Sequence, residues 1–117
     1  AVFCCPSIYE PFGIINLEAM ACGTAVVASA VGGIPGVVVE GETGLLIDPN
    51  LTPTPPHDPV DGDDFARRLA AAIDRVAGDA VLRERMGQAG RQRVIDHFSW
   101  TSIAHRTLDL YQSLKSA

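Results

Sequence analysis

The first 48 residues alternate short apolar runs with turns marked by glycine or proline, and this alternation constrains the fold more than any other feature of the sequence. Residues 1–5, 25–28 and 44–47 are apolar runs bounded by proline, glycine or aspartate. A short run without polar positions is typical of a strand that is buried on both faces, as in a parallel sheet. The pattern predicts three buried parallel strands.

The apolar run between the first two predicted strands has the spacing of a helix. Within residues 14–22, Ile14, Leu17 and Ala21 fall on one helical face, and Gly23 follows where a left-handed C-terminal cap is expected. A strand, a helix and a second strand form a βαβ unit, whose two strands are parallel neighbours. We therefore predict an α/β fold with a Rossmann-like parallel sheet.

Composition divides the chain into three parts. Residues 1–49 hold the predicted βαβ core, residues 50–62 form a proline-rich exposed loop, and residues 63–117 show the periodicity of C-terminal helices of the same domain. The first of these helices has an apolar stripe followed by Gly78, and the stripe consists of Phe65, Leu69, Ile73 and Val76. We expect the helices to cover the edge of the sheet.

Two further helices are predicted after this one. The first begins near Asp79, and we expect its arginines to form a solvated face; they are Arg83, Arg85, Arg91 and Arg93. The second begins after Ser99 and carries a long apolar stripe. Trp100 and Tyr111 lie on that stripe, so we expect them to belong to the core rather than to a binding site.

The charges are distributed unevenly along the chain. Residues 1–66 contain nine carboxylates and neither lysine nor arginine, and the formal net charge of the whole chain is −5. A nucleic-acid-binding surface needs clustered cations to neutralise phosphates. We therefore expect no nucleic acid partner.

Other features argue against several common classes of protein. Three cysteines, of which two are adjacent, fit neither a disulfide scaffold nor a zinc site, and the three histidines form no triad or metal set. We expect reduced thiols, no metal, and a cytoplasmic protein, because the chain opens without a basic leader. Residues 19–39 are uncharged, but glycines and a proline interrupt them, so we expect no membrane span.

The loop between the first strand and the first helix is the candidate binding site. Ligands of open α/β sheets bind at the carboxyl ends of the strands, and the first turn of a helix offers backbone N–H groups to an anion there. Gly13 would let a phosphate approach the main chain. Glu10 precedes the helix and Glu18 lies on it, so each carboxylate could accept hydrogen bonds from a vicinal diol. A nucleotide sugar offers hydroxyls, a diphosphate and then hydroxyls.

A simpler interpretation exists for the two carboxylates. An acidic residue near the start of a helix complements the helix dipole by roughly 0.3–1 kcal/mol without binding a ligand. The combination of Glu10, Gly13 and Glu18 at the end of a strand favours ligand binding.

The residues around this loop resemble a known family. The segment from Glu10 to Glu18 matches the E-x7-E motif of the retaining GT-B glycosyltransferases of family four. The blocks Pro-Phe-Gly, Leu-Glu-Ala-Met-Ala-Cys-Gly, Val-Gly-Gly-Ile-Pro and Gly-Glu-Thr-Gly-Leu-Leu resemble the family's donor-binding domain. The later Gly-Arg-Gln-Arg and Phe-Ser-Trp are similar to the helical tail of its bacterial glycogen synthases, including those that make α-maltose-1-phosphate. The resemblance covers nearly the whole chain.

The resemblance implies the C-terminal half of a GT-B fold, here incomplete, with a helical C-terminal tail. It implies a hexosyltransferase that moves glucose from a nucleotide sugar, ADP-glucose foremost, to an α-glucan or glucose-1-phosphate. Glu10 would be the catalytic carboxylate and would hold donor-sugar hydroxyls. Phe12, Gly13 and Ile14 would offer backbone amides to the donor, and Glu18 would bind the ribose diol.

The resemblance also implies that part of the active site lies outside this chain. Members of the family stabilise the leaving diphosphate with an arginine and a lysine that precede the motif, and they need no metal or other cofactor. The acceptor would bind a missing N-terminal domain, so we expect these 117 residues alone to transfer no sugar. Gly36 stands where the family usually has glutamate, and no contact is assigned to it.

Three alternatives remain open on the sequence. The enzyme could use a UDP- or GDP-sugar instead of ADP-glucose. The chain could be a non-catalytic nucleotide-binding module in which the two glutamates serve stability alone. It could also be an interaction domain that docks through its helical tail.

Overall fold

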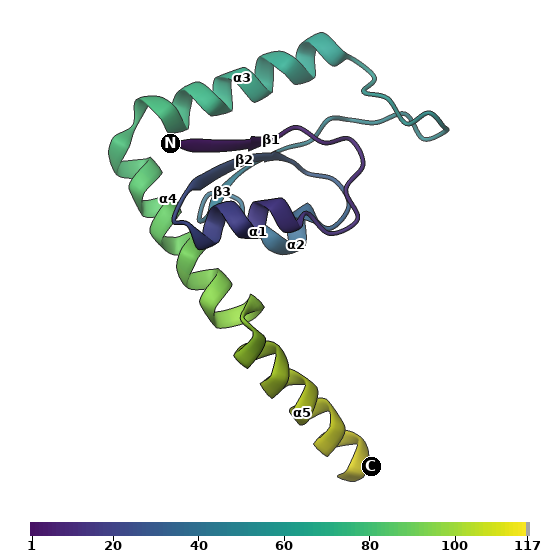
Figure 1. Cartoon of the computed structure of the whole chain (residues 1–117). Coiled ribbons are helices and arrows are strands. Elements are labelled where there is room, and N and C mark those ends of the chain that lie inside the picture. The colour runs from purple at the N-terminus through teal and green to yellow at the C-terminus, as the bar shows by residue number, and fades with distance from the viewer. Residues whose placement is uncertain (117) are drawn as a thin grey trace.

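The structure is a computed structural model that describes residues 1–116. Three strands, β1 (Val2–Cys5), β2 (Ala25–Ser29) and β3 (Gly44–Ile47), form one parallel sheet in the order β1-β2-β3 (Figure 1). The register pairs Val2 with Ala25 and Val26 with Gly44. The three predicted strands and the α/β fold are confirmed.

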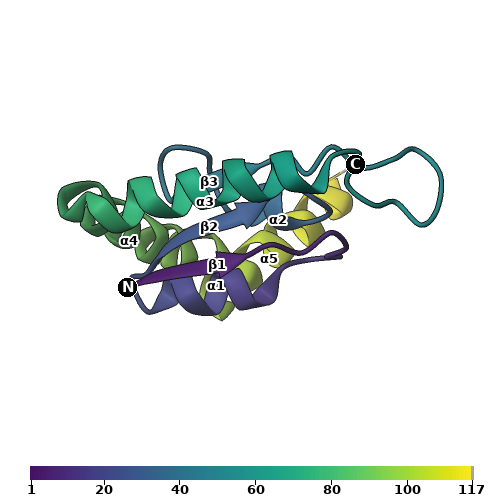
Figure 2. The same ribbon diagram turned by 90° about the horizontal axis from the view of Figure 1, so that it is seen from above.

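Helices cover both faces of this sheet. β2 is buried along its whole length, and its side chains alternate between two apolar clusters. Val26 and Ala28 pack with α1 (Ile14–Ala21) and α2 (Ile34–Val37), whereas Ala25 and Val27 pack with α3 (Gly62–Gly78) and α4 (Ala80–Arg93). Figure 2 shows the sheet between these layers. The doubly covered sheet explains why its strands carry no polar face.

Helix α1 begins at Ile14 as predicted and ends at Ala21, one residue before the end of the apolar run. Its buried residues are Asn16 and Met20, whereas Ile14 is 59% exposed. Of the three residues that the spacing places on one face, Leu17 packs against the core cluster, whereas Ile14 is exposed. Apolar residues occur all around this short helix, so their spacing selects no single face. Gly23 has φ +73°, which confirms the left-handed cap.

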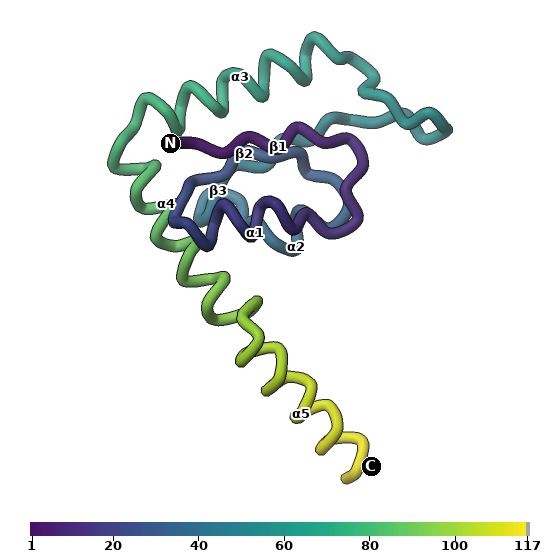
Figure 3. The backbone as a smooth tube through the Cα atoms, viewed as in Figure 1, coloured from purple at the N-terminus to yellow at the C-terminus, as the bar shows by residue number. Residues whose placement is uncertain are grey.

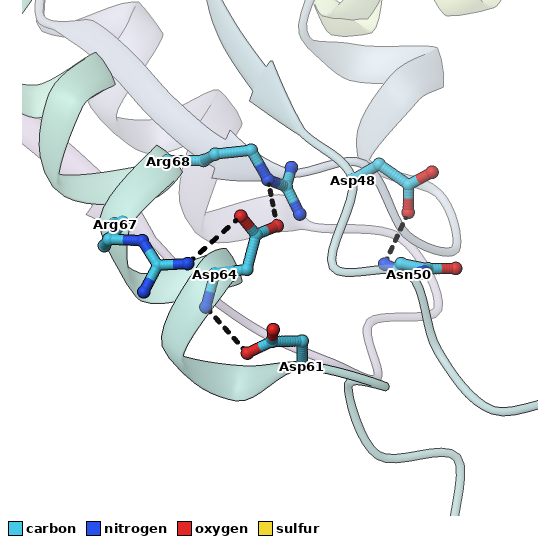
Figure 4. Close-up of polar contacts among 6 residues, drawn as sticks. All are labelled: Asp48, Asn50, Asp61, Asp64, Arg67 and Arg68. Atoms are coloured by element: carbon cyan, nitrogen blue, oxygen red, sulfur yellow. Dashed lines mark hydrogen bonds and ion pairs between the residues drawn. The ribbon is translucent and has the colours of Figure 1, made fainter.

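Local hydrogen bonds order both ends of the proline-rich segment, residues 50–62, and the segment folds back on itself. The backbone N–H of Asn50 donates to the Asp48 carboxylate at 2.8 Å, and Asp61 caps α3 by accepting from the Asp64 N–H at 3.0 Å (Figure 4). The Thr52 N–H donates to the Asp58 carbonyl at 2.9 Å. Within α3 the predicted stripe is confirmed, because its members are buried or packed against the sheet.

Three arginines of α4 bind backbone carbonyls at the ends of other helices. Arg83 donates to Val76 and Ala77 at the end of α3, Arg91 donates to Ala21 at the end of α1, and Arg93 donates to Val37 and Gly36 at the end of α2. The predicted solvated face is wrong for Arg83 and Arg93, which are partly buried, whereas Arg91 is exposed although it too binds a carbonyl. A cation at a helix C-terminus satisfies carbonyls that lack an intrahelical partner and complements the dipole. Sequence spacing could not reveal which helix ends lie nearby.

The last helix, α5 (Trp100–Ser116), extends away from the body of the molecule after the π-helix η1 (Val94–Phe98) (Figure 3). No described residue of α5 is buried, and Trp100 is 86% exposed. The expectation that Trp100 and Tyr111 belong to the core is therefore wrong. No helix in residues 1–116 combines the length and apolar character that crossing a membrane requires.

Candidate functional site

The loop of residues 6–13 joins the carboxyl end of β1 to the start of α1. Glu10 lies in this loop and is partly buried. The Ser7 hydroxyl donates to Glu10 Oε2 at 3.4 Å and lies 3.5 Å from Cys5 Sγ. The last residue of the strand and the carboxylate are thus linked through one hydroxyl, which limits where the carboxylate can move.

Two glycines after β2 hold the main chain of the same loop. The Gly33 N–H donates to the Glu10 carbonyl at 3.0 Å. A Cβ on Gly32 would lie 1.8 Å from the Glu10 carbonyl oxygen, and a Cβ on Gly33 would lie 2.7 Å from Phe12 Cα. No side chain fits at either position. The segment after β2 therefore fixes the position of the Glu10 main chain at the carboxyl end of the sheet. The sequence did not predict this role for Gly32 and Gly33, although two adjacent glycines after a strand are a signal of close backbone approach.

Gly13 begins helix α1 in the left-handed conformation, with φ +86°. A Cβ there would lie 3.1 Å from both Ile34 Cγ1 and Asn16 Nδ2, so its direction is inward. We expected glycine here because it would leave room for a phosphate, but the missing side chain would point into the protein interior and not toward a ligand. Backbone conformation and interior packing require glycine here.

The other predicted residues lie along the same helix end. Phe12 and Ile14 are exposed on either side of Gly13. Glu18 lies one turn further along α1 and lines a cavity of about 590 Å³ beside the outer edge of β1, together with Phe3, Ile15, Cys22 and others. Glu10 does not line this cavity. The structure thus brings Glu10, Phe12, Gly13 and Ile14 together and places Glu18 beside a separate, mainly apolar space.

Asn16 is a buried polar residue that the sequence analysis missed. Its side chain is fully buried in the first turn of α1, and neither its amide nitrogen nor its oxygen has a partner among the described residues. Leaving buried polar atoms unpaired costs about 1–3 kcal/mol. The sequence feature that could have indicated its burial is its place as the one polar residue in the apolar run Ile-Ile-Asn-Leu.

The electrostatics of the loop depend on backbone dipoles. Residues 1–66 supply no lysine or arginine, so within this segment the first turn of α1 is the source of positive potential. Burial, and then the neighbouring Cys5, raise the pKa of the Cys4 thiol, which keeps β1 uncharged. Residues 1–116 contain no cluster of three side chains that could hold a metal ion. The arrangement can bind hydroxyls through its carboxylates and an anion through its amides.

Comparisons with known proteins find clear similarity. Residues 1–55 match the family described as glycosyl transferases group 1. The chain is 52% identical to an α-maltose-1-phosphate synthase of Mycobacterium tuberculosis over 97% of its own length and 27% of that protein. It is 37% identical to a glycogen synthase of the same species, over 94% of this chain and 23% of that one. The chain spans about a quarter of the length of these curated relatives.

A solved structure extends the similarity to three dimensions. The sucrose-phosphate synthase of Thermosynechococcus elongatus is 42% identical and superposes with a TM-score of 0.73. The match covers 98% of this chain and 25% of that one. The sheet, its covering helices and the tail therefore correspond to part of a GT-B glycosyltransferase.

Proposed function

Because this chain belongs to the group 1 glycosyltransferases, a family of enzymes, we propose that it forms the donor-binding part of a retaining hexosyltransferase. The single observation that carries the proposal is the placement of Glu10. Its carboxylate stands at the carboxyl end of the sheet beside the N-terminus of α1, and Ser7, Gly32 and Gly33 hold it there. Ligands of open parallel sheets bind at this edge.

Each part of the loop has a role in binding the donor. Glu10 accepts hydrogen bonds from hydroxyls of the donor sugar next to the reacting carbon. The backbone amides at Phe12, Gly13 and Ile14 face the sugar and the diphosphate. Glu18, which lines the cavity beside β1, binds the ribose diol. The mainly apolar lining of that open hollow offers a packing surface to the nucleoside.

The chemical step that we propose is transfer with retention of anomeric configuration. The leaving diphosphate gains negative charge as its bond to the sugar breaks, and the amide dipoles of α1 are oriented toward that charge in advance. Cations from elsewhere in the protein complete the stabilisation, since residues 1–66 contain none. No metal is required in this scheme.

We propose ADP-glucose as the donor and an α-glucan or glucose-1-phosphate as the acceptor. The support is the similarity to an α-maltose-1-phosphate synthase and a glycogen synthase. A UDP- or GDP-sugar is the alternative donor. The acceptor is bound jointly with the rest of the protein, because this chain corresponds to about a quarter of such enzymes.

Calorimetric titration of the full-length protein with ADP-glucose and UDP-glucose tests donor binding. We expect Glu18→Ala to weaken binding of the preferred donor by at least about tenfold, because hydrogen bonds to a charged group are each worth about 1.5–3 kcal/mol. Glu42→Ala, which removes an exposed carboxylate in the turn before β3, is the matched control and should leave binding unchanged. Normal binding by the Glu18→Ala variant would refute the ribose assignment.

A second variant separates catalysis from binding. Glu10→Gln keeps the shape of the side chain but removes its charge, and we expect kcat to fall by about 10²-fold or more while the donor still binds. Unchanged turnover in this variant would instead support a non-catalytic, nucleotide-binding role for the loop.

A further inference from the structure

A second cavity lies between the loop that carries Glu10 and the proline-rich segment. Its volume is about 350 Å³, and it is lined by Ile8, Tyr9, Leu51, Pro56 and His57. Both segments extend beyond the carboxyl end of the sheet (Figures 1 and 2). The volume is near the lower end of the roughly 300–1,000 Å³ of ligand pockets, which suits a small ligand. The cavity shares no lining residue with the one that contains Glu18.

The Tyr9 side chain presents an aromatic surface to solvent at this place. It is 82% exposed, and its hydroxyl makes no hydrogen bond within residues 1–116. A tyrosine ring combines an apolar face with a polar tip, a combination that favours a ligand with both C–H and hydroxyl groups. Tyr9 directly precedes Glu10, so their Cα atoms are about 3.8 Å apart.

The opposite wall is held in a fixed conformation. His57 has φ +59°, its N–H donates to the Thr54 carbonyl at 3.1 Å, and its Nδ1 lies 3.0 Å from the Thr52 carbonyl oxygen. Since a carbonyl only accepts, Nδ1 carries the hydrogen in this contact. In the neutral ring Nε2 is then left as an acceptor for a hydroxyl.

The charge of the cavity selects among ligands. None of its five lining residues carries a formal charge when His57 is neutral. The first cations along the chain, Arg67 and Arg68, both contact Asp64 (Figure 4). The lining contains no lysine or arginine that could neutralise a phosphate. A neutral, hydroxyl-rich ligand matches the lining better.

We propose that this cavity binds one neutral hexopyranose ring of the acceptor and so adds a contact from this chain to an acceptor site that the rest of the protein completes, an inference that rests on the function proposed above. The C–H face of the ring packs on Tyr9 and Pro56, and its hydroxyls bond to the Tyr9 hydroxyl and His57 Nε2. Binding there places the acceptor beside the residue that holds the donor sugar. The nucleoside occupies the other cavity, so the two substrates do not compete.

Kinetics of the full-length enzyme test this assignment. The acceptor KM and the ADP-glucose KM are measured separately, with maltotriose and with glucose-1-phosphate as acceptors. We expect Tyr9→Ala to raise the acceptor KM by about tenfold and His57→Ala by about fivefold, with the donor KM within about twofold of the parent value. Tyr9→Phe keeps the ring and should cost less than about threefold. Val60→Ala, at an exposed position of the same segment outside the cavity, is the control.

A binding measurement keeps the inference testable apart from the proposed function. Maltotriose and glucose-1-phosphate are titrated into the full-length protein without donor. If the wild type transfers no sugar, the proposed function fails, but loss of sugar binding in Tyr9→Ala with retention in Val60→Ala still supports the cavity. Unchanged acceptor KM and sugar affinity in both Tyr9→Ala and His57→Ala would overturn it. An equal rise in donor and acceptor KM would also overturn it, because it would indicate a disturbed Glu10 loop.

Discussion

Helices α3 and α5 are both 17 residues long and both carry an apolar stripe, yet their surroundings differ completely. In α3, Phe65, Ala72 and Val76 are buried, and Ala72 and Val76 pack with strands of the sheet. In α5 no described residue is buried, and Tyr111 is 64% exposed. An apolar stripe thus specifies which side of a helix can be covered, but the position of the neighbouring elements decides whether it is.

The first turns of the two helices also differ in charge, because only α3 carries acidic residues there. Asp61 caps α3, and Asp64 in its first turn binds Arg67 and Arg68. Ser99 caps α5 by accepting from the Ser102 N–H at 3.1 Å, and no acidic residue lies in its first turn. The local signals for a helix start are present in both, so local sequence accounts for the helices themselves and not for their packing.

The largest expected effect contrasts the buried stripe with the exposed one. Phe65 is 8% exposed, so Phe65→Ala should lower the free energy of unfolding by about 3–5 kcal/mol through lost burial and a new cavity. Tyr111→Ala should change it by less than about 0.5 kcal/mol. Urea denaturation of the protein measures both. A loss for Tyr111→Ala as large as that for Phe65→Ala would show that α5 is covered in solution.

An intermediate loss of stability is expected for Arg93, the last residue of α4, which precedes η1 and α5. Arg93 donates to the carbonyls of Val37 and Gly36 at 2.9 and 3.0 Å, and its guanidinium carbon lies 5.5 Å from the centre of the Phe98 ring. Arg93→Ala should destabilise the protein by about 1–2 kcal/mol.

The control for this prediction is Arg85→Ala, an exposed arginine on the same helix, which should stay within about 0.5 kcal/mol of the parent. Equal effects of the two substitutions in thermal unfolding would contradict the assigned role of Arg93.

The smallest effect concerns the start of α3. Hydrogen bonding to Arg68 lowers the pKa of the Asp64 carboxyl below its ordinary value. A lowered folded-state pKa contributes stability above the unfolded-state pKa, and that stability is lost as the pH falls through the folded-state value. Asp64→Asn should therefore lower Tm slightly at pH 7, and the difference should begin to shrink as the pH falls below about 4 and vanish below the folded-state pKa. A difference in Tm that persists unchanged at low pH would exclude the ion pair as its cause.

The candidate site was partly predictable from the sequence. Glu10, Phe12, Gly13 and Ile14 follow a strand and begin a helix, which fixes their place at the sheet edge by topology alone. The supporting contacts of Gly32 and Gly33 come from a segment about twenty residues away, and the cavity between Tyr9 and His57 joins segments nearly fifty residues apart. Such contacts depend on how strands are arranged side by side, which a local pattern does not encode.

The sequence by itself determined the three strands, the start of α1 and the left-handed cap at Gly23, because each depends on residues near in the chain. The tertiary structure decided that α1 buries Asn16 and Met20, that Arg83, Arg91 and Arg93 bind the ends of other helices, and that α5 packs its stripe on no part of residues 1–116. The physical reason is the range of the interactions. Backbone hydrogen bonds and turn conformations are local, whereas burial and helix-end charges depend on which surfaces meet after the chain has folded.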